Sequence, residues 1–429
     1  MTSDTFTSTV KTWKKCAIGS GRSRCRKRRK AGHRPVNILV FNAGSSTLKA
    51  SLFNENVFLK KGRDATSLLF ETNTKVAGGE RAPFKKAASG AIQKILKDSG
   101  QKKESISMVG HRIVHGGTKL RATTVIDKGV IEEIESRIAL APAHNPNALG
   151  CIDAAQSFFG KEIRQIAVFD TAFHRTIPEM RSLYPVPHEW TEKFEIRRYG
   201  FHGINHAYCS RRAGEMLPDS AERIIICHLG NGCSLSAVLH GVSVNTTMGF
   251  TPLEGLMMGT RCGSIDPGII LHLINNEKFD GEKLDEILNK KSGLLAVSGK
   301  TGDMREILEA RSGHDEKAAL AFDMFIDRLS HYIAAFTASL GGLDTLVFTG
   351  GIGEHSAEVR QSVVENLTYL GLRLDAQANK DAVGDDTADA TISAKNSKVA
   401  ILKIRAGEDF EIARQCFEFA SAQVFTSWP

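Results

Sequence analysis

Hydrophobic and polar positions along the chain alternate between two kinds of segment. Short, continuously apolar runs predict buried strands, whereas residues 317–340 place apolar side chains at helical spacing and predict a helix. A polar, Gly- and Ala-rich stretch over residues 381–398 predicts a surface loop or an edge hairpin. This alternation indicates an α/β fold. The predicted strands are residues 37–41, 164–169, 223–228, 345–349 and 398–404.

One arrangement of strand, glycine turn and strand occurs twice. The first copy is ILVFNAGSSTLKASLF and the second is IIICHLGNGCSLSAVLHG, and aligning Asn42 with His228 places Gly44 on Gly230. Chance is one explanation, because strand–Gly–strand patterns are common. The other is an ancient duplication, with two small-residue turns that bring backbone N–H groups close to one polyphosphate from two sides.

Length and composition restrict the class of protein. A chain of 429 residues favours two domains, and 41% hydrophobic with 24% charged residues is ordinary for a globular protein. No apolar run approaches the roughly 18 residues that cross a bilayer, and no signal-peptide core is present. The eight cysteines include no C-x-x-C pair, which disfavours zinc and disulfides and favours a reducing compartment. We therefore expect a cytoplasmic location and no membrane partner.

The net charge of +8 is unevenly distributed. Residues 1–36 carry +10, and the remainder carries −2. The nearly neutral body gives no reason to expect nucleic-acid binding, so that partner is disfavoured and rests on the tail alone. We expect residues 1–36 to be a disordered basic tail, since they hold too few apolar residues for a core. A mis-assigned start, a functional basic arm and an organelle leader are the three interpretations of it.

Glycine-rich and histidine-rich loops follow several predicted strands. TLVFTGGIGEHS is a third glycine turn after a strand and matches neither a P-loop nor a G-x-G-x-x-G fingerprint. Five further segments are dense in His, Arg and Gly, which is typical of catalytic loops on a rigid scaffold. They are VGHRIVHGG, APAHNPNALG, VFDTAFHRTIP, RRYGFHGINHAY and MGFTPLEGLMMGTRCGSIDPG.

These segments together resemble the acetokinase family, and within it the members that phosphorylate acetate. The motifs NAGSSTLK, GHRIVHGG, HNPNALG, FDTAFH, RRYGFHG, HLGNG, MGFTPLEGLMMGTR and GGIGE occur in the same order and cover roughly residues 37–415. The resemblance implies duplicated ribonuclease-H-like domains of the actin, heat-shock ATPase and sugar kinase superfamily, with a nucleotide cleft between them. It implies an N-terminal domain of residues 37–169 plus 409–429 and a C-terminal domain of residues 170–408.

The resemblance also implies roles for individual residues. It implies a catalytic aspartate and two groups that stabilise the transition state: Asp170, His202 and Arg261. It implies a substrate site formed by Arg112, His144 and Ala143, and a metal site formed by Asn42 and Glu408. It implies nucleotide contacts from Lys49, His228, Leu229, Gly230, Asn231, Gly232, Asp303, Met304, Arg305, Gly351, Ile352, Gly353, Glu354 and His355. The implied cofactor is Mg²⁺, with Mn²⁺ as the alternative, and ATP/ADP is a substrate.

The chain departs from the family pattern at several of these positions, and two departures concern the acyl pocket and the metal site. The chain reads APAHNP where the family usually reads APLHNP, so Ala143 stands where a leucine lines the acyl pocket. AGEDFEIAR replaces TNEELMIAR, which keeps Glu408 and makes the next acid Asp409. The first change puts the preferred acid in doubt and the second leaves the reaction in place.

The expected activity is reversible transfer of a phosphoryl group from ATP to acetate, giving acetyl phosphate. Because a carboxylate oxygen is already a nucleophile, no strong base is needed, and we expect Asp170 to orient other groups. A propionate kinase or broader short-chain carboxylate kinase is the alternative within this class. A non-catalytic nucleotide-gated binding module, as in actin or the heat-shock ATPases, is the alternative from another class. The resemblance implies a homodimer.

Overall fold

The computed structural model describes residues 36–59, 68–384 and 388–426. The chain divides into a unit of residues 1–36 and a unit of residues 37–429. The predicted basic tail, apart from Val36, therefore lies outside the described residues. Among those that are described, no helix is both long and apolar enough to pass through a membrane.

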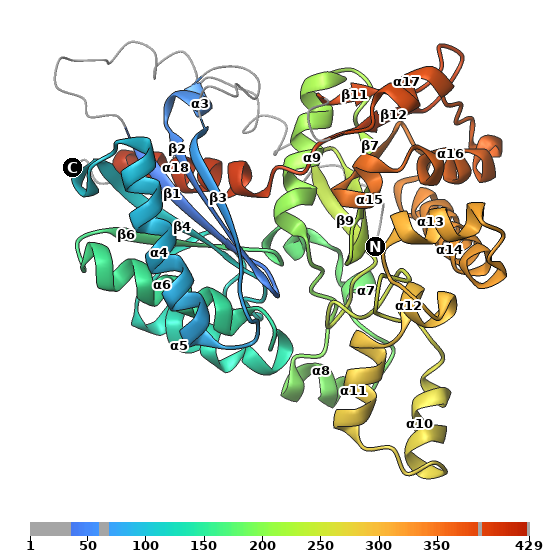
Figure 1. The fold of residues 1–429 in the computed structure, drawn as a ribbon, viewed down its shortest axis with the longest axis horizontal. Coiled ribbons are helices and arrows are strands. Elements are labelled where there is room, and N and C mark those ends of the chain that lie inside the picture. Colours follow the sequence, from blue (N-terminus) through green and yellow to red (C-terminus); the bar gives the residue numbers. More distant parts are fainter. Residues whose placement is uncertain (1–35, 60–67, 385–387, 427–429) are drawn as a thin grey trace, which may run out of the picture. The chain divides into compact units, whose positions relative to one another are not determined.

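The first part of the second unit forms a six-stranded mixed sheet, sheet A (Figure 1). Its order is β3-β2-β1-β4-β6-β5. Every residue of β1 is buried, as expected for a continuously apolar strand in the middle of a sheet covered on both faces. The strands are β1 (Asn37–Ala43), β2 (Thr47–Asn54), β3 (Leu68–Lys75), β4 (Ile106–Ile113), β5 (Thr124–Val125) and β6 (Arg164–Phe169).

The later part of the unit forms a second six-stranded sheet, sheet B, with the order β11-β12-β10-β7-β8-β9. Its central strands β7 and β10 are again almost entirely buried. The strands are β7 (Arg223–Leu229), β8 (Cys233–Leu239), β9 (Val242–Thr246), β10 (Thr345–Thr349), β11 (Ala390–Thr391) and β12 (Ala400–Lys403).

The two sheets have the same topology. In sheet A, β1, β2 and β3 are antiparallel, β4 and β6 run parallel to β1, and the short β5 is antiparallel to β6. In sheet B, β7, β8 and β9 are antiparallel, β10 and β12 run parallel to β7, and the short β11 is antiparallel to β12. The repeated hairpin thus opens both halves, and the predicted duplication is confirmed.

Helices α4 and α6 cover one face of sheet A. They pack on each other and on strands β1 to β4. Gly100 ends α4 in the left-handed conformation, and Pro146 begins α6 in its first turn, where no N–H is needed. The helices of this part are α3 (Asn56–Leu59), α4 (Arg81–Ser99), α5 (Lys128–Ser136) and α6 (Asn145–Phe159), with short 3-10 turns at Lys103–Ser105 and Ile138–Leu140.

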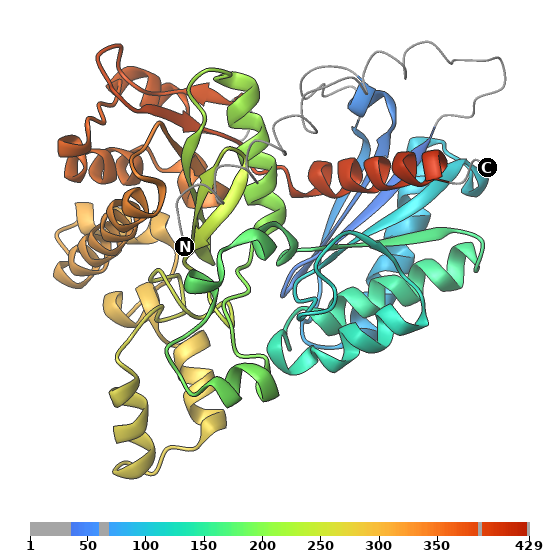
Figure 2. The same cartoon turned by 180° about the vertical axis from the view of Figure 1, so that it is seen from behind.

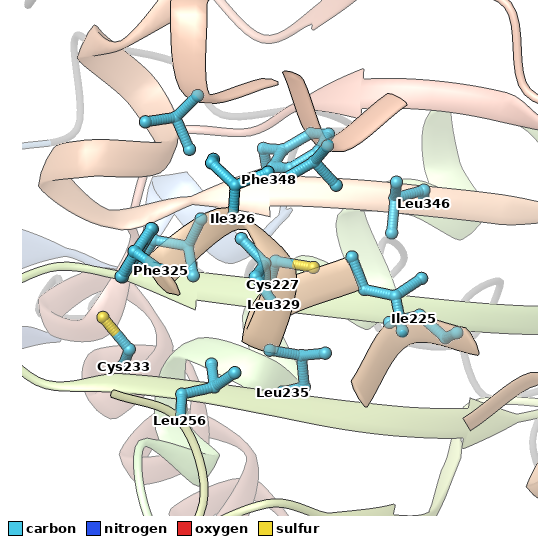
Figure 3. Packing of buried hydrophobic residues seen from close by; sticks show 14 of the residues in the cluster. Ile225, Cys227, Cys233, Leu235, Leu256, Phe325, Ile326, Leu329, Leu346 and Phe348 are labelled. Carbon is cyan, nitrogen blue, oxygen red and sulfur yellow. The ribbon is translucent and has the colours of Figure 1, made fainter. Parts of the chain in front are cut away.

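One face of sheet B is covered by the long helix α14 (Glu316–Leu340), which contacts β7, β8 and β9. Figure 3 shows side chains of this core: Ile225, Cys227, Cys233, Leu235, Leu256, Phe325, Ile326, Leu329, Leu346 and Phe348. The other helices of this part are α7 (Glu179–Ser182), α8 (His188–Phe194), α9 (Gly203–Met216), α10 (Pro267–Asn275), α11 (Gly281–Lys290), α12 (Gly293–Ser298), α13 (Met304–Ser312), α15 (Gly350–His355), α16 (Ala357–Asn366) and α17 (Ala376–Asp381), with 3-10 turns at Ala172–Thr176 and Thr368–Leu370.

Two helices cross from one sheet to the other. α9 follows the last strands of sheet A but packs on β7 and β10 of sheet B. α18 (Glu408–Thr426) follows β12 of sheet B but packs on β1, β4 and β6 of sheet A, as the red helix in Figures 1 and 2 shows. The starts of both helices consequently lie where the ends of the central strands of the two sheets meet.

Most of the elements expected from the hydrophobic pattern are confirmed. β1, β6, β7, β10 and α14 match the predicted ranges to within a few residues. The run over residues 398–404 contributes a shorter strand, Ala400–Lys403, and the polar stretch before it contributes the edge strand β11. The two predicted domain boundaries, after Phe169 and after Glu408, stay a prediction.

Candidate active site

An ion-pair cluster lies at the carboxyl ends of the three parallel strands of sheet A. Asn42 is near the end of β1, Arg112 near the end of β4, and Asp170 directly follows β6. The guanidinium of Arg112 donates to the Asp170 carboxylate from Nη2 at 2.7 Å and from Nε at 3.2 Å. Its Nη1 donates to Asn42 Oδ1 at 3.0 Å. Three residues from distant parts of the sequence thus form one hydrogen-bonded group.

The first turn of α18 completes this cluster. Asn42 Nδ2 donates to Glu408 Oε2 at 2.9 Å and to Asp409 Oδ1 at 2.7 Å. Arg112 Nη1 lies 3.5 Å from Glu408 Oε2. Acidic side chains are favourable at a helix N-terminus, because the backbone N–H groups and the helix dipole there are positive. The acid at position 408 is therefore held both by its own helix and by sheet A.

Burial and charge have opposite effects on the carboxyl groups of this cluster. Burial raises the pKa of Asp170, whose side chain is 1% exposed, although Arg112 and the His202 N–H oppose the shift. For Glu408, burial alone would raise the pKa, but Arg112, His228 and Asn42 outweigh it and lower the pKa. The nearby carboxylates likewise outweigh burial and raise the pKa of Arg112 above its usual value. Arg112 therefore stays cationic in a partly buried place.

Lys49 reaches the same cluster from β2. Its ammonium lies 2.9 Å from Glu71 and 3.6 Å from Asp409. Burial lowers the pKa of Lys49, but these two carboxylates outweigh burial and raise it. Asp409 also accepts a hydrogen bond from Ser51 at 2.7 Å. Asp409, noted in the sequence only as a departure from the family pattern, thus joins Asn42, Ser51 and Lys49.

Two histidines lie near this cluster: His228 at the end of β7 and His202 at the start of α9. His202 caps α9 in the left-handed conformation, with φ 55°, and its ring stacks on that of His228 with centroids 4.2 Å apart. The next residue must be glycine, because a Cβ at Gly203 would lie 2.0 Å from the carbonyl oxygen of Asp170. The close approach of α9 to Asp170 thus fixes the position of the His202 imidazole.

Both imidazoles are neutral near pH 7. Burial lowers the pKa of His202 well below 6.5, and His228, Arg112 and Arg261 lower it further. Burial also lowers the pKa of His228. Asn205 Nδ2 lies 2.8 Å from His228 Nδ1, while Asn205 Oδ1 accepts the Gly407 N–H at 3.1 Å. Because the amide must donate to His228 Nδ1, the proton of His228 is on Nε2.

Arg261 is the second cation of the site, and its surroundings differ from those of Arg112. Among the described residues, its Nη1 contacts only the Pro252 carbonyl, at 3.3 Å, and the Met258 sulfur, at 3.9 Å. Within the described part of the chain, Arg261 forms no ion pair, and burial lowers its pKa. A partly buried guanidinium that keeps free donors and lacks a carboxylate partner is suited to an anionic ligand.

Arg261 and His202 flank one open point. A Cβ built on Gly232 would lie 3.4 Å from Arg261 Nη1 and 3.5 Å from His202 Nε2. Gly232 is in the turn between β7 and β8, and its φ lies outside the left-handed region, so the backbone does not require glycine there. The absent side chain leaves space for a small group that both donors can reach.

His144 lies at the start of α6, within electrostatic range of both arginines. Burial, Arg112 and Arg261 lower its pKa to about 3, so this imidazole is also neutral. The neighbouring Ala143 is exposed, and its carbonyl accepts from Asn147 Nδ2 at 2.7 Å. The predicted lining of an acyl pocket by Ala143 stays a prediction.

The chemistry of the predicted metal ligands fits a hard cation. Asn42 and Glu408 offer amide and carboxylate oxygens, which Mg²⁺ prefers. Over residues 36–59, 68–384 and 388–426, no group of three or more His, Cys, Asp or Glu side chains is arranged to hold a metal. Mg²⁺ bound with nucleotide usually takes only one or two protein ligands, and phosphates and waters supply the rest. Two neighbouring oxygen ligands are therefore sufficient.

The other predicted nucleotide contacts lie on three segments. The segment His228–Gly232 covers the end of β7 and the turn to β8. Gly350, which precedes the segment Gly351–His355, lies so close to it that a Cβ there would be 2.8 Å from the carbonyl oxygen of Leu229. Glu354 Oε1 accepts the N–H groups of Gly350, at 3.0 Å, and Ala406, at 2.9 Å. Its carboxylate thereby links the third glycine turn to the segment before Glu408.

The segment 303–305 starts α13. Asp303 caps this helix by accepting the Arg305 N–H at 2.9 Å, and it also pairs with the Arg305 guanidinium at 2.6 Å. Met304 and Leu229 are buried in the core of sheet B, so only their backbone atoms face outward. A cavity of about 150 Å³ adjoins this segment and is lined by Ser298, Lys300, Thr301, Glu306, Ile307, Ala310 and Ala318.

The predicted residues thus fall into two groups. Asn42, Lys49, Arg112, Asp170 and Glu408 form one network, and it reaches His202 through the hydrogen bond from the His202 N–H to the Asp170 carboxyl. The second group consists of the segments 303–305 and 351–355, which lie at the start of α13 and in α15.

Sequence reasoning missed Asn205 and Ser234. In the fold, Asn205 contacts His228 and Ser234 contacts His202, but small polar residues alone give no functional signal in a sequence. Asn205 follows His202 by three positions, so it lies on the same side of α9.

Two copies of one mixed sheet, each covered by helices on both faces, define a duplicated α/β fold of the actin, heat-shock ATPase and sugar kinase superfamily. A sequence model of the acetokinase family matches residues 37–414. The chain belongs to this family of kinases with a carboxylate acceptor.

Relatives support this membership over most of the chain. The acetate kinase of Nostoc punctiforme is 45% identical over 410 residues, which cover 89% of this chain and 99% of that protein. The acetate kinase of Microcystis aeruginosa is 51% identical over 317 residues, covering 73% and 78%.

Solved structures agree. Porphyromonas gingivalis acetate kinase has a TM-score of 0.79 at 36% identity, covering 89% of this chain and 99% of that one. A propionate kinase of Francisella tularensis has a TM-score of 0.79 at 35% identity, covering 89% and 98%.

Proposed function

We propose that this protein catalyses reversible, Mg²⁺-dependent transfer of a phosphoryl group from ATP to acetate, giving ADP and acetyl phosphate. The observation that carries the proposal is that Arg261 Nη1 and His202 Nε2 flank the open point at Gly232, and that Arg261 has no carboxylate partner among the described residues. A transferring phosphoryl group spreads negative charge over three equatorial oxygens, and preorganised donors around it lower the barrier.

In this proposal the acetate carboxylate is the nucleophile. One of its oxygens forms a bond to the γ-phosphorus of ATP while the bond to the ADP oxygen breaks, and ADP leaves with the electron pair. No proton is removed, so no general base is needed. Arg112 and His144 hold the carboxylate, and Asp170 acts by holding Arg112 and the start of α9 in place.

Asn42 and Glu408 are proposed to hold the metal ion. When bound, Mg²⁺ neutralises charge on the nucleotide phosphates. The chain itself positions these ligands through Arg112 and through the first turn of α18. ATP is proposed to contact Lys49 and the segments 228–232, 303–305 and 351–355.

The test is an initial-rate screen of formate, acetate, propionate and butyrate with ATP and Mg²⁺, with acyl phosphate trapped as its hydroxamate. The wild-type protein should form acyl phosphate, with acetate among the best acids. Gly232→Ala should lower kcat about 10²–10³-fold, because the methyl group occupies the space between the donors. Its melting temperature should stay unchanged, since the methyl meets protein atoms only at van der Waals distance.

Gly90→Ala is the matched control, because a Cβ there meets no atom within 4 Å and α4 contains none of the site residues. It should leave the rate unchanged. Absence of acyl phosphate with all four acids would reject the proposal and favour the non-catalytic nucleotide-gated module.

A propionate kinase is the second candidate within the class. It is supported by Ala143, which offers less bulk than the leucine usual at this position, and by the likeness to the Francisella tularensis propionate kinase. The same screen separates the two, because a propionate kinase should have the higher kcat/KM with propionate.

We further propose that the protein acts as a homodimer in the cytoplasm. The support is α10, which has no buried residue and exposes three large apolar side chains: Ile269 (48%), Leu271 (60%) and Ile274 (42%). Exposed apolar patches of this kind mark interaction surfaces. Light scattering should give the mass of a dimer, and Leu271→Glu with Ile274→Glu should give a monomer; an unchanged mass would place the interface elsewhere.

A further inference from the structure

Ser234 lies between two histidines on the face of sheet B that α9 covers. Its hydroxyl oxygen is 2.9 Å from His202 Nδ1 and 2.8 Å from His206 Nε2. Ser234 itself is fully buried in β8, as is His206 in α9. This chain of three side chains ends at His202, one of the two donors proposed to stabilise the transferring group.

The chain of hydrogen bonds admits two arrangements of protons. A serine hydroxyl has a single hydrogen, so it can donate to only one of the two imidazole nitrogens, and the other nitrogen must donate to it. Either His206 Nε2–H donates to Ser234 and Ser234 donates to His202 Nδ1, or the direction is reversed. Both histidines are neutral, because burial lowers their pKa values well below 6.5.

The far nitrogen of His206 distinguishes the two arrangements. His206 Nδ1 is buried and has no hydrogen-bond partner in the described part of the chain. In the reversed arrangement this nitrogen would carry a buried, unpaired N–H, whereas in the first it is an unprotonated acceptor. Orphaned buried N–H groups are rarer in proteins than under-used acceptors, so the first arrangement is favoured.

We propose that Ser234 and His206 are positioning residues that keep His202 in the tautomer with Nδ1 as acceptor and Nε2–H as donor. The Nε2–H then points to the side of the ring that flanks Gly232 and Arg261 Nη1. A neutral imidazole in the other tautomer would present a lone pair to the phosphoryl oxygens and repel them. The inference rests on the proposed function for its kinetic consequence, but the tautomer itself does not depend on it.

The direct test is nitrogen NMR of the ligand-free protein with ¹⁵N-labelled histidine, with His202 assigned by its loss in His202→Gln. The expected pattern is an unprotonated Nδ1 and a protonated Nε2. A protonated Nδ1 on His202 in the wild-type protein would overturn the proposal, whatever the enzyme proves to catalyse. An inactive protein with the expected pattern would instead reject the proposed function and leave this inference standing.

Kinetics of Ser234→Ala give the second readout. Loss of the positioning hydroxyl should lower kcat about 10–100-fold, less than the about 10²–10³-fold expected for losing a donor outright. The KM values for ATP and acetate should change less than about threefold, because the His202 ring acts mainly on charge that develops during transfer. A rise in KM at unchanged kcat would contradict the assignment.

Ser236→Ala is the matched control. Ser236 lies two residues further along β8, on the same face, and its buried hydroxyl has no partner among the described residues. It should leave kcat and the His202 nitrogen pattern unchanged. If Ser236→Ala lowers kcat as much as Ser234→Ala, the effect is structural and the positioning role is wrong.

The third comparison is between His206→Gln and His206→Leu. The amide of glutamine can still donate to Ser234, so His206→Gln should keep kcat within about fivefold of wild type, whereas His206→Leu should lower it further and give mixed His202 tautomers. Equal kcat values for the two variants at equal melting temperature would remove His206 from the proposal.

Discussion

The ends of the central strands of sheets A and B have equivalent positions in the duplicated topology but opposite electrostatics. At sheet A, Arg112 is neutralised by Asp170 and Glu408, and Asn42 hydrogen-bonds to both Arg112 and Glu408. At sheet B, Arg261 has no carboxylate partner among the described residues, and the imidazoles of His202 and His228 are neutral. One end is a satisfied ion network, and the other keeps its donors free.

The difference separates two tasks that phosphoryl transfer requires. A paired network costs little further reorganisation and holds ligands in fixed positions, which suits metal and carboxylate binding. Donors that have no carboxylate partner can instead bind the negative charge that develops on the transferring phosphoryl group, and so they suit stabilisation of the transition state. The duplicated backbone thus supplies two equivalent places, and the side chains at strand ends decide what each one does.

Replacing the two arginines should affect stability to very different extents, and this is the largest expected effect. Arg112→Met leaves the buried Asp170 without its cation and should lower the free energy of unfolding by about 3–5 kcal/mol. Arg261→Met removes a cation that has no partner, and should change stability by less than about 1 kcal/mol. Urea titration measures both.

Adding Asp170→Asn to Arg112→Met is the control for the first result. It removes the unpaired carboxylate and should recover part of the lost stability. Equal destabilisation by the two arginine replacements would show that the contrast between the two ends is not electrostatic.

Removing the free donor should affect catalysis more than binding. Arg261→Ala should lower kcat by about 10²–10³-fold, because a preorganised donor to developing charge is lost. The KM for ATP should change much less. Initial rates at saturating and limiting ATP separate the effect on kcat from the effect on KM. A kcat within a few-fold of wild type with raised KM values would make Arg261 a binding residue.

Acid should destabilise the protein because it contains several buried neutral histidines. Burial lowers the pKa of His111 and His144 to about 3, and that of His115 and His174 to about 4. Below about pH 6.5 the unfolded chain binds protons that the folded chain does not, so the free energy of unfolding falls as pH falls.

Urea titration at about pH 7.5 and about pH 5.5 checks this sign, with a loss of about 1 kcal/mol for each such histidine. His174→Gln removes one titrating group and should reduce the difference between the two pH values by that amount. Equal stability at both pH values would mean that these histidines are protonated in the folded protein.

The smallest effect concerns the acid bound at the Arg112 side. Ala143→Leu restores bulk beside His144 and should raise the acetate-to-propionate ratio of kcat/KM by about 10-fold, since one methylene in an apolar pocket is worth about 1–3 kcal/mol. The ratio is measured by hydroxamate formation with both acids. An unchanged ratio would mean that the exposed position 143 does not line the acyl pocket.

The sequence by itself determined the strands, the long helix and the repeat of the opening hairpin. Short continuous apolar runs such as Ile38–Phe41 favour a strand buried on both faces, because they are too short for a typical helix, and this signal is local in the sequence. Resemblance also identified Arg112, Asp170 and Glu408, which the fold brings into one network although 296 positions separate the first from the last.

Only the tertiary structure decided which charges are paired and which donors are free. Both arginines have a glycine two positions before them, and nothing in this spacing distinguishes Arg112 from Arg261. The distinction arises because α18 crosses back to sheet A and brings Glu408 and Asp409 to Asn42, while no acidic residue among those described pairs with Arg261. Pairing depends on distances of a few ångströms between distant segments, and the electrostatic energy of a site depends on those distances rather than on sequence order.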